Sequence, residues 1–353
     1  MEGTNKTNEL KRDSGILIWL YSGCFLIFAM VIIGGITRLT GSGLSITEWK
    51  VITGTLPPLS EAAWIAEFEA YKQSPQFQRI NSHFQLSDFQ QIYWWEYIHR
   101  LVARILGLVF IFPLIYFIVK KRINKALAPK LGVIFLLGAW QGVLGWLMVA
   151  SGLQSNPHVS HINLATHLVN AFILFGYIYW VTLDLQYTND SLTSYRPKRE
   201  AMKFSWILLA LFAIQLTYGA FVAGLRAGNI FNTWPLMDGQ VIADSVFIAF
   251  EKTGFASLVN NHATVQFIHR TVAIIFLLAV VYFWYNRNTS AFSLKGEQKN
   301  AINILLIVTL LQVLLGITTL LLYVPLILGV VHQAMAFVLF GLLIFIWHRL
   351  KFA

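Results

Sequence analysis

The sequence has few charged residues and almost no cysteine. Asp, Glu, Lys and Arg make up 12% of its 353 residues, whereas 57% are hydrophobic. A soluble domain carries about 25% charged residues, so the composition excludes an ordinary soluble domain. The single cysteine, Cys24, excludes a disulfide within the chain. It lies in an apolar run, where we expect it to pack as a small buried side chain.

Acidic residues are scarcer than basic ones, 16 against 26, which gives a net charge of +10. Lys and Arg gather in the loops on one side of an eight-span topology, the positive-inside pattern of membrane proteins. The basic charge therefore indicates orientation in a lipid bilayer, not nucleic-acid binding, and places both termini in the cytoplasm. Residues 1–12 lack the character of an organelle presequence. We expect a bacterial cell (inner) membrane, not a mitochondrial one.

Eight apolar runs are long enough to cross a membrane, because about 20 apolar residues in a helix span the hydrocarbon core. They predict an all-α polytopic membrane protein. The expected spans are residues 16–37, 94–119, 131–150, 161–183, 203–224, 263–285, 300–322 and 325–347.

Three phrases occur twice in the chain. They begin at Glu96 and Gln266, at Trp140 and Leu311, and at His167 and His332. The duplication predicts two tandem four-helix bundles, related by a pseudo-two-fold axis along the membrane normal. The halves are residues 1–190 and 191–353. The first has a long outer loop, 38–93, in which 60–73 and 86–93 are expected as surface helices.

Four histidines lie inside the duplicated phrases, each within roughly two turns of the start of an expected span. They share one depth near the outer face, His99 and His167 in the first half and His269 and His332 in the second. Two facing imidazoles in a bundle can ligate the iron of one flat heme. Hydrogen-bonded core histidines are the plain alternative. Zinc needs more ligands than two, and a proton relay would not require pairs at equal depth.

The duplicated phrases differ at one polar position, Glu96 against Gln266. Glu96 shares a helix face with His99, so a carboxylate would lie beside the first heme. It could take a proton or stabilise a cation. The alternative is an acid placed in the first helical turn by the helix dipole alone. The difference predicts a reaction site in the first half and an electron-storage site in the second.

Three arginines follow the histidines, namely Arg100, Arg104 and Arg270. Guanidinium groups suit heme propionates. Pairing with an acidic residue, or reaching to the membrane interface, is the alternative role.

These residues together resemble the heme A synthase family. The resemblance covers nearly the whole chain and includes Glu96 with His99 and Arg100, His269 with Arg270, and the Gly/Ser/Thr-rich segment 34–45 followed by Glu48 and Trp49. The missing outer-loop cysteine pair places the chain nearest the cysteine-free members.

The resemblance implies an oxidoreductase that acts on heme O for cytochrome oxidase assembly. Heme O would lie between His99 and His167, heme b between His269 and His332, and Glu96 would be the catalytic carboxylate. Two hydroxylations of one ring methyl and loss of water would give a formyl group. Iron held by two histidines has no open position, so either a ligand leaves or water attacks an oxidised ring.

Two other functions stay open on the residues alone. A di-heme b-type electron-transfer cytochrome, linked to quinol, would use the same histidines without a substrate heme. A transporter would need no such ligands. Heme O synthase itself is disfavoured, because Asp184 and Asp190 look like isolated loop residues. We expect contact with heme O synthase, and self-association into a homo-oligomer stays open.

Overall fold

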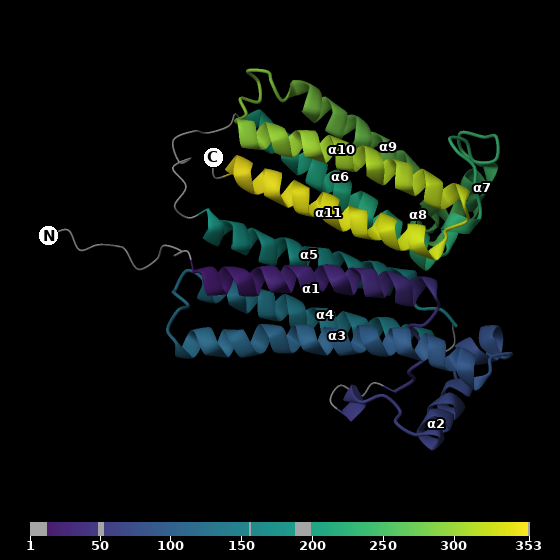
Figure 1. Ribbon diagram of the computed structural model, residues 1–353. Helices are drawn as coiled ribbons and strands as arrows, with labels where there is room; N and C mark the ends of the chain where they lie inside the picture. Colours follow the sequence, from purple (N-terminus) through teal and green to yellow (C-terminus); the bar gives the residue numbers. More distant parts are fainter. Residues whose placement is uncertain (1–12, 49–52, 155–156, 188–198, 352–353) are drawn as a thin grey trace.

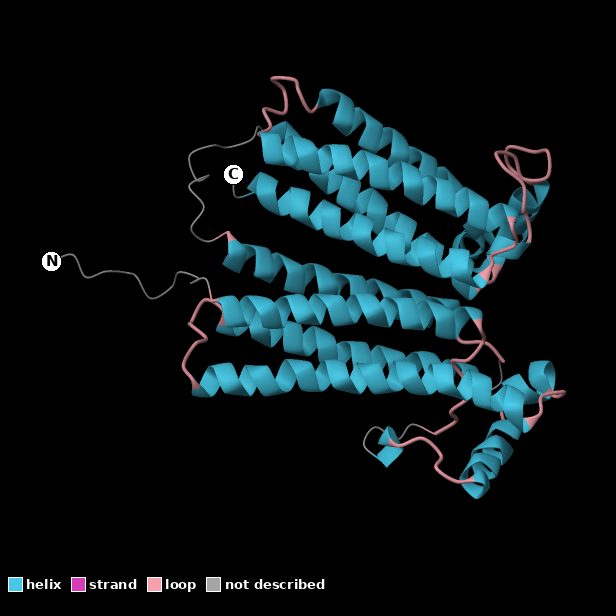
Figure 2. Ribbon diagram, viewed as in Figure 1, coloured by secondary structure: helices cyan, strands magenta, loops and turns pink. Residues whose placement is uncertain are grey.

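Figure 1 shows the computed structural model of the chain, which describes residues 13–48, 53–154, 157–187 and 199–351. Helices form the regular structure of these residues, apart from one isolated β-bridge between Met237 and Gln240 (Figure 2). The predicted boundary between the halves, at 190 and 191, lies outside the described residues.

Eight helices are long and apolar enough to cross a membrane, so the predicted all-α, multi-pass class is confirmed. In chain order they are α1 (Ser14–Leu39), α3 (Leu86–Val119), α4 (Ala128–Leu153), α5 (His161–Gln186), α6 (Arg199–Gly224), α9 (His262–Asn286), α10 (Gly296–Leu321) and α11 (Leu326–Lys351).

Three short helices lie at the same end of the long ones, one beside the first half and two beside the second (Figure 1). They are α2 (Glu61–Lys72), α7 (Asp244–Thr253) and α8 (Ser257–Asn260). The helix expected over 60–73 is therefore present as α2.

The separate surface helix expected over 86–93 is wrong, because those residues are the first turns of α3. No helix-breaking residue separates them from the apolar run, and Phe89 and Tyr93 bury against α2 with Phe68 and Tyr71. The Asp88 carboxylate accepts the Gln85 N–H at 2.9 Å and fixes the start of the helix.

Helix contacts divide the molecule into two groups. In the first, α1 packs on α3 and α5, and α5 packs on α4. In the second, α6 packs on α9 and α11, and α11 packs on α10. Between the groups, α5 contacts α6 while α1 contacts α11. These two contacts exchange when the halves are exchanged, which is the pattern that a two-fold relation produces.

Aromatic rings fill the space between the two groups. Phe172 of α5 lies 6.1 Å from Phe212 of α6 and 5.0 Å from Phe337 of α11, between ring centroids. Phe340 of α11 stacks on Phe212 at 5.3 Å. Interlocked rings of this size resist sliding, so the halves pack as one body.

Asp184 is not the isolated loop residue that the sequence suggested. It lies in α5, and its buried carboxylate contacts the Lys130 ammonium and, at 3.1 Å, the His348 ring. The contact joins α5 to α11 at the end opposite the short helices. The sequence predicted a loop position for Asp184 because its partners, Lys130 and His348, lie far from it along the chain.

Candidate functional site

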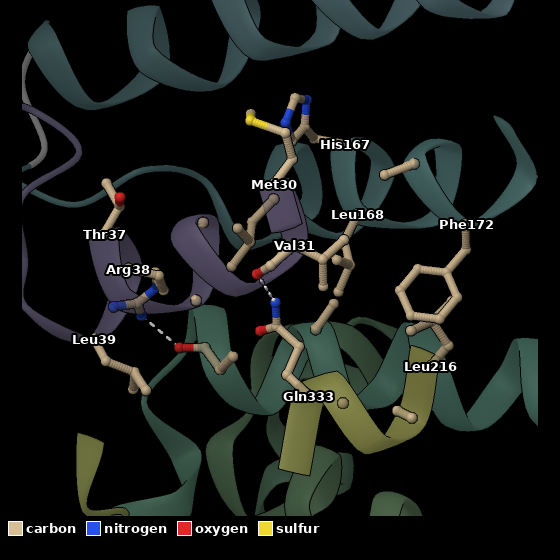
Figure 3. A pocket seen from close by; sticks show the side chains of 18 of the residues that line it. Met30, Val31, Thr37, Arg38, Leu39, His167, Leu168, Phe172, Leu216 and Gln333 are labelled. Carbon is tan, nitrogen blue, oxygen red and sulfur yellow. Dashed lines mark hydrogen bonds between the residues drawn. The ribbon is translucent and has the colours of Figure 1, made fainter. Parts of the chain in front are cut away.

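One cavity of about 1190 Å³ reaches into both halves, and its lining includes all four predicted histidines. Part of its wall is shown in Figure 3, where Met30, Arg38 and His167 approach it from α1 and α5. The structure therefore gathers His99, His167, His269 and His332 around connected space.

Each histidine faces a glycine of a neighbouring helix. A Cβ atom added to Gly34 would meet the His99 ring at 3.3 Å, and one added to Gly145 would meet the His167 ring at 3.3 Å. The same holds in the second half, where Gly219 faces His269 at 3.1 Å. A Cβ atom added to Gly316 would meet the His332 ring at 2.9 Å. A larger residue would push the ring away, so glycine at these positions sets where each imidazole lies.

A glutamine stands one turn before three of these glycines. The Gln141 amide nitrogen lies 3.2 Å from His167 Nε2, and that of Gln215 lies 3.4 Å from His269 Nε2. The amide of Gln312 lies 3.5 Å from His332 Nε2. At the matching place in α1, before Gly34, the chain carries Met30 instead. His99 is thus the one ligand candidate without this glutamine.

The imidazoles of each half, His99 with His167 and His269 with His332, line the same cavity. Nδ1 is buried without a hydrogen-bond partner in three of them, namely His167, His269 and His332. A buried nitrogen without a partner is costly, so each ring is suited to a ligand. Within the described residues, no three His, Cys, Asp or Glu side chains gather around one point. Paired imidazoles beside a large apolar cavity suit an iron macrocycle, which brings its other ligands with it.

Glu96 is buried, with 3% of its surface exposed, and its carboxylate is held on both sides. Oε2 accepts bonds from the Ser45 N–H at 2.7 Å, the Ser45 hydroxyl at 2.8 Å and the Ile46 N–H at 2.9 Å. Oε1 accepts two from the Arg100 guanidinium, at 2.6 and 3.1 Å. Gly41 begins the loop that delivers these donors, with a left-handed φ of 71°.

Glu96 lies well inside α3, which begins at Leu86. The placement of Glu96 by the dipole of a first helical turn is therefore wrong. His99 is likewise further from its helix start than the sequence suggested, because α3 extends beyond the membrane run.

Gln266 occupies the same place in the second half and is also buried. Its amide donates to the Phe231 carbonyl at 3.3 Å, while its own oxygen has no partner. Arg270 donates to the Phe231 carbonyl and, at 3.4 Å, to that of Leu236. Both halves therefore use this pair of positions to hold the loop that follows the preceding span, but only Glu96 places a carboxylate there.

The three predicted arginines have different surroundings. Arg100 binds Glu96 and the carbonyl oxygens of Ile46 and Glu48, each at 3.0 Å. Arg270 holds its loop in the same way, and Arg104 lines the cavity. Propionate contact stays a prediction for all three.

Sequence reasoning missed Ser45 as a Glu96 partner, and it missed the glycines that face the histidines. The duplicated phrases contained a signal for the second group, since Gln141 with Gly145 repeats as Gln312 with Gly316. No pattern in the sequence indicated that segment 41–46 folds back on Glu96.

The eight spans, with a pair of cavity-lining histidines in each half, define a polytopic membrane protein with two internally related sites. The family described as "Cytochrome oxidase assembly protein" matches residues 17–344. A heme A synthase of Flavobacterium johnsoniae is 46% identical over 97% of this chain and 99% of the relative. That of Flavobacterium psychrophilum is 48% identical over 96% and 99%. That of Nitrosospira multiformis is 45% identical over 95% and 93%. The chain belongs to the heme A synthase family.

Proposed function

We propose that this oxidoreductase converts heme O to heme A in its first half, residues 1–190, with the substrate between His99 and His167. Heme b lies between His269 and His332 of the second half, residues 191–353. The membership in the heme A synthase family supports the reaction. The matched glycine and histidine positions support one macrocycle in each half.

One observation carries the choice of reacting half. Glu96 and Gln266 occupy matching places beside a ligand candidate, and both are buried. A carboxylate beside one heme only is needed for chemistry on that heme, while a neutral amide suffices beside a heme that passes electrons. A di-heme conductor has no use for the difference.

Glu96 acts as a fixed negative charge in this proposal. Its five hydrogen bonds come from donors only, so the carboxylate is held in place before the substrate arrives. Charge fixed in a site that excludes water stabilises opposite charge that develops during a reaction. With water as the source of oxygen, each of two successive hydroxylations of the ring methyl releases two electrons and two protons to an external electron acceptor and builds positive charge on the macrocycle, and loss of water from the dihydroxylated carbon then leaves the formyl group.

The second half is suited to a resident heme b, which supplies a centre that takes up and passes on electrons. His269 and His332 would be its axial ligands. Gln215 and Gln312 orient their rings, and Gly219 and Gly316 leave the rings room. Neither Gln215 nor Gln312 carries a negative charge.

The sites lie toward the outer face of a bacterial cell membrane, with both termini in the cytoplasm. Basic residues such as Lys120, Lys121, Arg287 and Lys295 lie at the ends of the long helices away from α2 and α7, as the positive-inside rule requires. Heme O synthase would deliver the substrate, and a homo-oligomer would be compatible with the exposed apolar helices.

Replacement of Glu96 tests the proposal. With a heme O source co-expressed, Glu96→Gln should lower heme A formation by roughly 10²–10³-fold, the usual cost of one electrostatic group. Heme b should stay bound. Pigments extracted from the purified protein and separated by chromatography give both quantities.

Glu61→Gln is the matched control, because it makes the same change at the exposed start of α2. It should leave heme A formation unchanged. A normal yield of heme A from Glu96→Gln would remove Glu96 from the reaction.

A further inference from the structure

The first half is open on one side where the second is closed. In the second half α9 and α10 pack along each other and complete the ring of helices. The backbones of their counterparts α3 and α4 lie further apart, and Phe110 of α3 reaches Phe135 of α4 through stacked rings whose centroids are 6.5 Å apart. The first bundle therefore has a seam, between α3 and α4, on the side away from the second half (Figure 1).

Three glycines lie along this seam and on the cavity wall, Gly107 of α3 and Gly138 and Gly142 of α4. All three are exposed, and a Cβ atom added to any of them would meet no atom within 4 Å. The free space beside these glycines is continuous with the cavity that they line. At this seam the surface faces lipid.

The second half carries larger residues at the same three places of its repeat. They are Leu277, Thr309 and Val313. Thr309 is buried, with 1% of its surface exposed. Larger side chains thus occupy the closed seam of the second half, whereas glycines occupy the same places in the first half.

The cavity also extends further along the helices in the first half, away from the histidines toward the opposite membrane face. There its lining includes Gly23 of α1, Phe110 of α3 and Ile134 of α4. In the second half, Leu208 of α6 stands at the position that corresponds to Gly23, and 1% of its surface is exposed. Gly23 itself has nothing within 4 Å of an added Cβ atom. The extension is walled by apolar groups, and space that the second half fills is left empty here.

We propose that the seam between α3 and α4 is a lateral opening to the bilayer and that the extension below it holds the isoprenoid chain of the substrate heme. The inference rests on the proposed function of the first half. Heme O differs from heme b by a long hydroxyethylfarnesyl substituent, and the two halves differ by a long apolar space. His167, with its unpartnered Nδ1, lines the upper part of the same cavity. An isoprenoid chain that moves from the lipid into this space stays in apolar surroundings and avoids exposure to water.

Closing the seam tests the opening. The variant Gly107→Leu, Gly138→Thr, Gly142→Val installs the residues of the second half. Expressed with a heme O source and purified, it should contain at least tenfold less heme O plus heme A than the wild type, with heme b unchanged. Retained heme b shows that the protein has folded. Wild-type amounts of heme O plus heme A in this variant would overturn the proposal.

Gly132→Leu is the matched control. Gly132 lies on α4, is exposed and has open space around it, but it does not line the cavity. It should keep the wild-type pigments. A loss there equal to that of the triple variant would overturn the proposal, because any bulk on α4 would then suffice.

Gly23→Leu tests the chain's place separately, since it fills the extension and leaves the seam open. Heme O plus heme A should fall, and an unchanged content would overturn this placement. A failure of the proposed function itself would give a different result. If the substrate does not bind between His99 and His167, the variant His99→Ala would still contain heme O, whether the seam is open or closed.

Discussion

In the first half, a buried carboxylate stands beside His99, and the α3 and α4 backbones lie further apart than those of any other neighbouring pair of the bundle. In the second half, a neutral amide stands beside His269 and the ring is closed by α9 and α10. The histidines and their facing glycines are the same in both. The comparison teaches that the paired histidines and glycines were kept in both halves, while the charge beside them and the spacing of the helices diverged. A reacting site needs both an exchangeable occupant and a polar group, whereas a storage site needs neither.

The largest expected effect comes from removing a ligand candidate from either half. His269→Ala should lose nearly all heme b, while His99→Ala should keep heme b and lose the substrate heme. Changes next to a metal ligand already cost roughly 10–100-fold in affinity, so loss of a ligand costs at least as much. Reduced-minus-oxidised spectra with pigment chromatography measure this. If His269→Ala left the heme b spectrum unchanged, the division between the halves would be lost.

A smaller effect should follow from making the second half resemble the first beside its histidine. Gln215→Met removes the amide that lies 3.4 Å from His269 Nε2 and gives α6 the residue that α1 has at Met30. We expect heme b to be retained about 10-fold less tightly, as for other residues that orient a ligand. Heme b content after extended washing in detergent checks this. The reverse change, Met30→Gln, should leave heme b as it is, and equal losses in both variants would contradict the assignment of Gln215 to His269.

The smallest effect should appear at the start of α1, at the end of the first half away from α2 and far from both sites. Asp13 caps α1 through the Gly15 N–H at 2.9 Å and pairs with Arg122, which lowers the pKa of the Asp13 carboxyl. A carboxyl with a lowered pKa in the folded state stabilises the protein above its unfolded pKa. This contribution is lost as the pH falls from about 4 through the lowered value.

Asp13→Asn should therefore lower the melting temperature at pH 7 by only a few degrees, because asparagine still caps α1 and only the exposed pairing with Arg122 is lost. Wild type and variant should converge as the solution is acidified. Thermal unfolding in detergent at several pH values follows both, with the pigments of the first two predictions unchanged. A gap that widened on acidification would show that another group is responsible.

Much of this molecule was predictable because its main signals are local or repeated. Apolar runs gave the eight spans, and the duplicated His-Arg phrases gave the four histidines. The start of α3 was misplaced, because residues 86–93 are less apolar than the span that they extend. Their burial comes from α2, which packs on them from elsewhere in the chain.

The surroundings of Glu96 were not predictable, for a physical reason. Its partners Ser45 and Ile46 act largely through backbone N–H groups, which any residue except proline possesses. Their direction depends on the path of the loop from Gly41. The open seam was hidden for a similar reason: glycines in a membrane helix usually indicate close packing, and only the arrangement of α3 and α4 shows that here they border a gap.

The contact of Arg38 with the second half shows what the fusion of the two repeats into one chain makes possible. The counterpart of Arg38 in the second half is Ala223, and the Arg38 guanidinium donates to the Ala223 carbonyl and, at 3.3 Å, to that of Gly224. Equivalent positions thus meet across the axis that relates the halves. In a symmetric dimer of identical chains, both positions would be arginine and two like charges would face each other, or neither would be and the bond would be missing. A single fused chain can place the arginine on one side and a small residue on the other, and so gains this contact without bringing two guanidinium groups together.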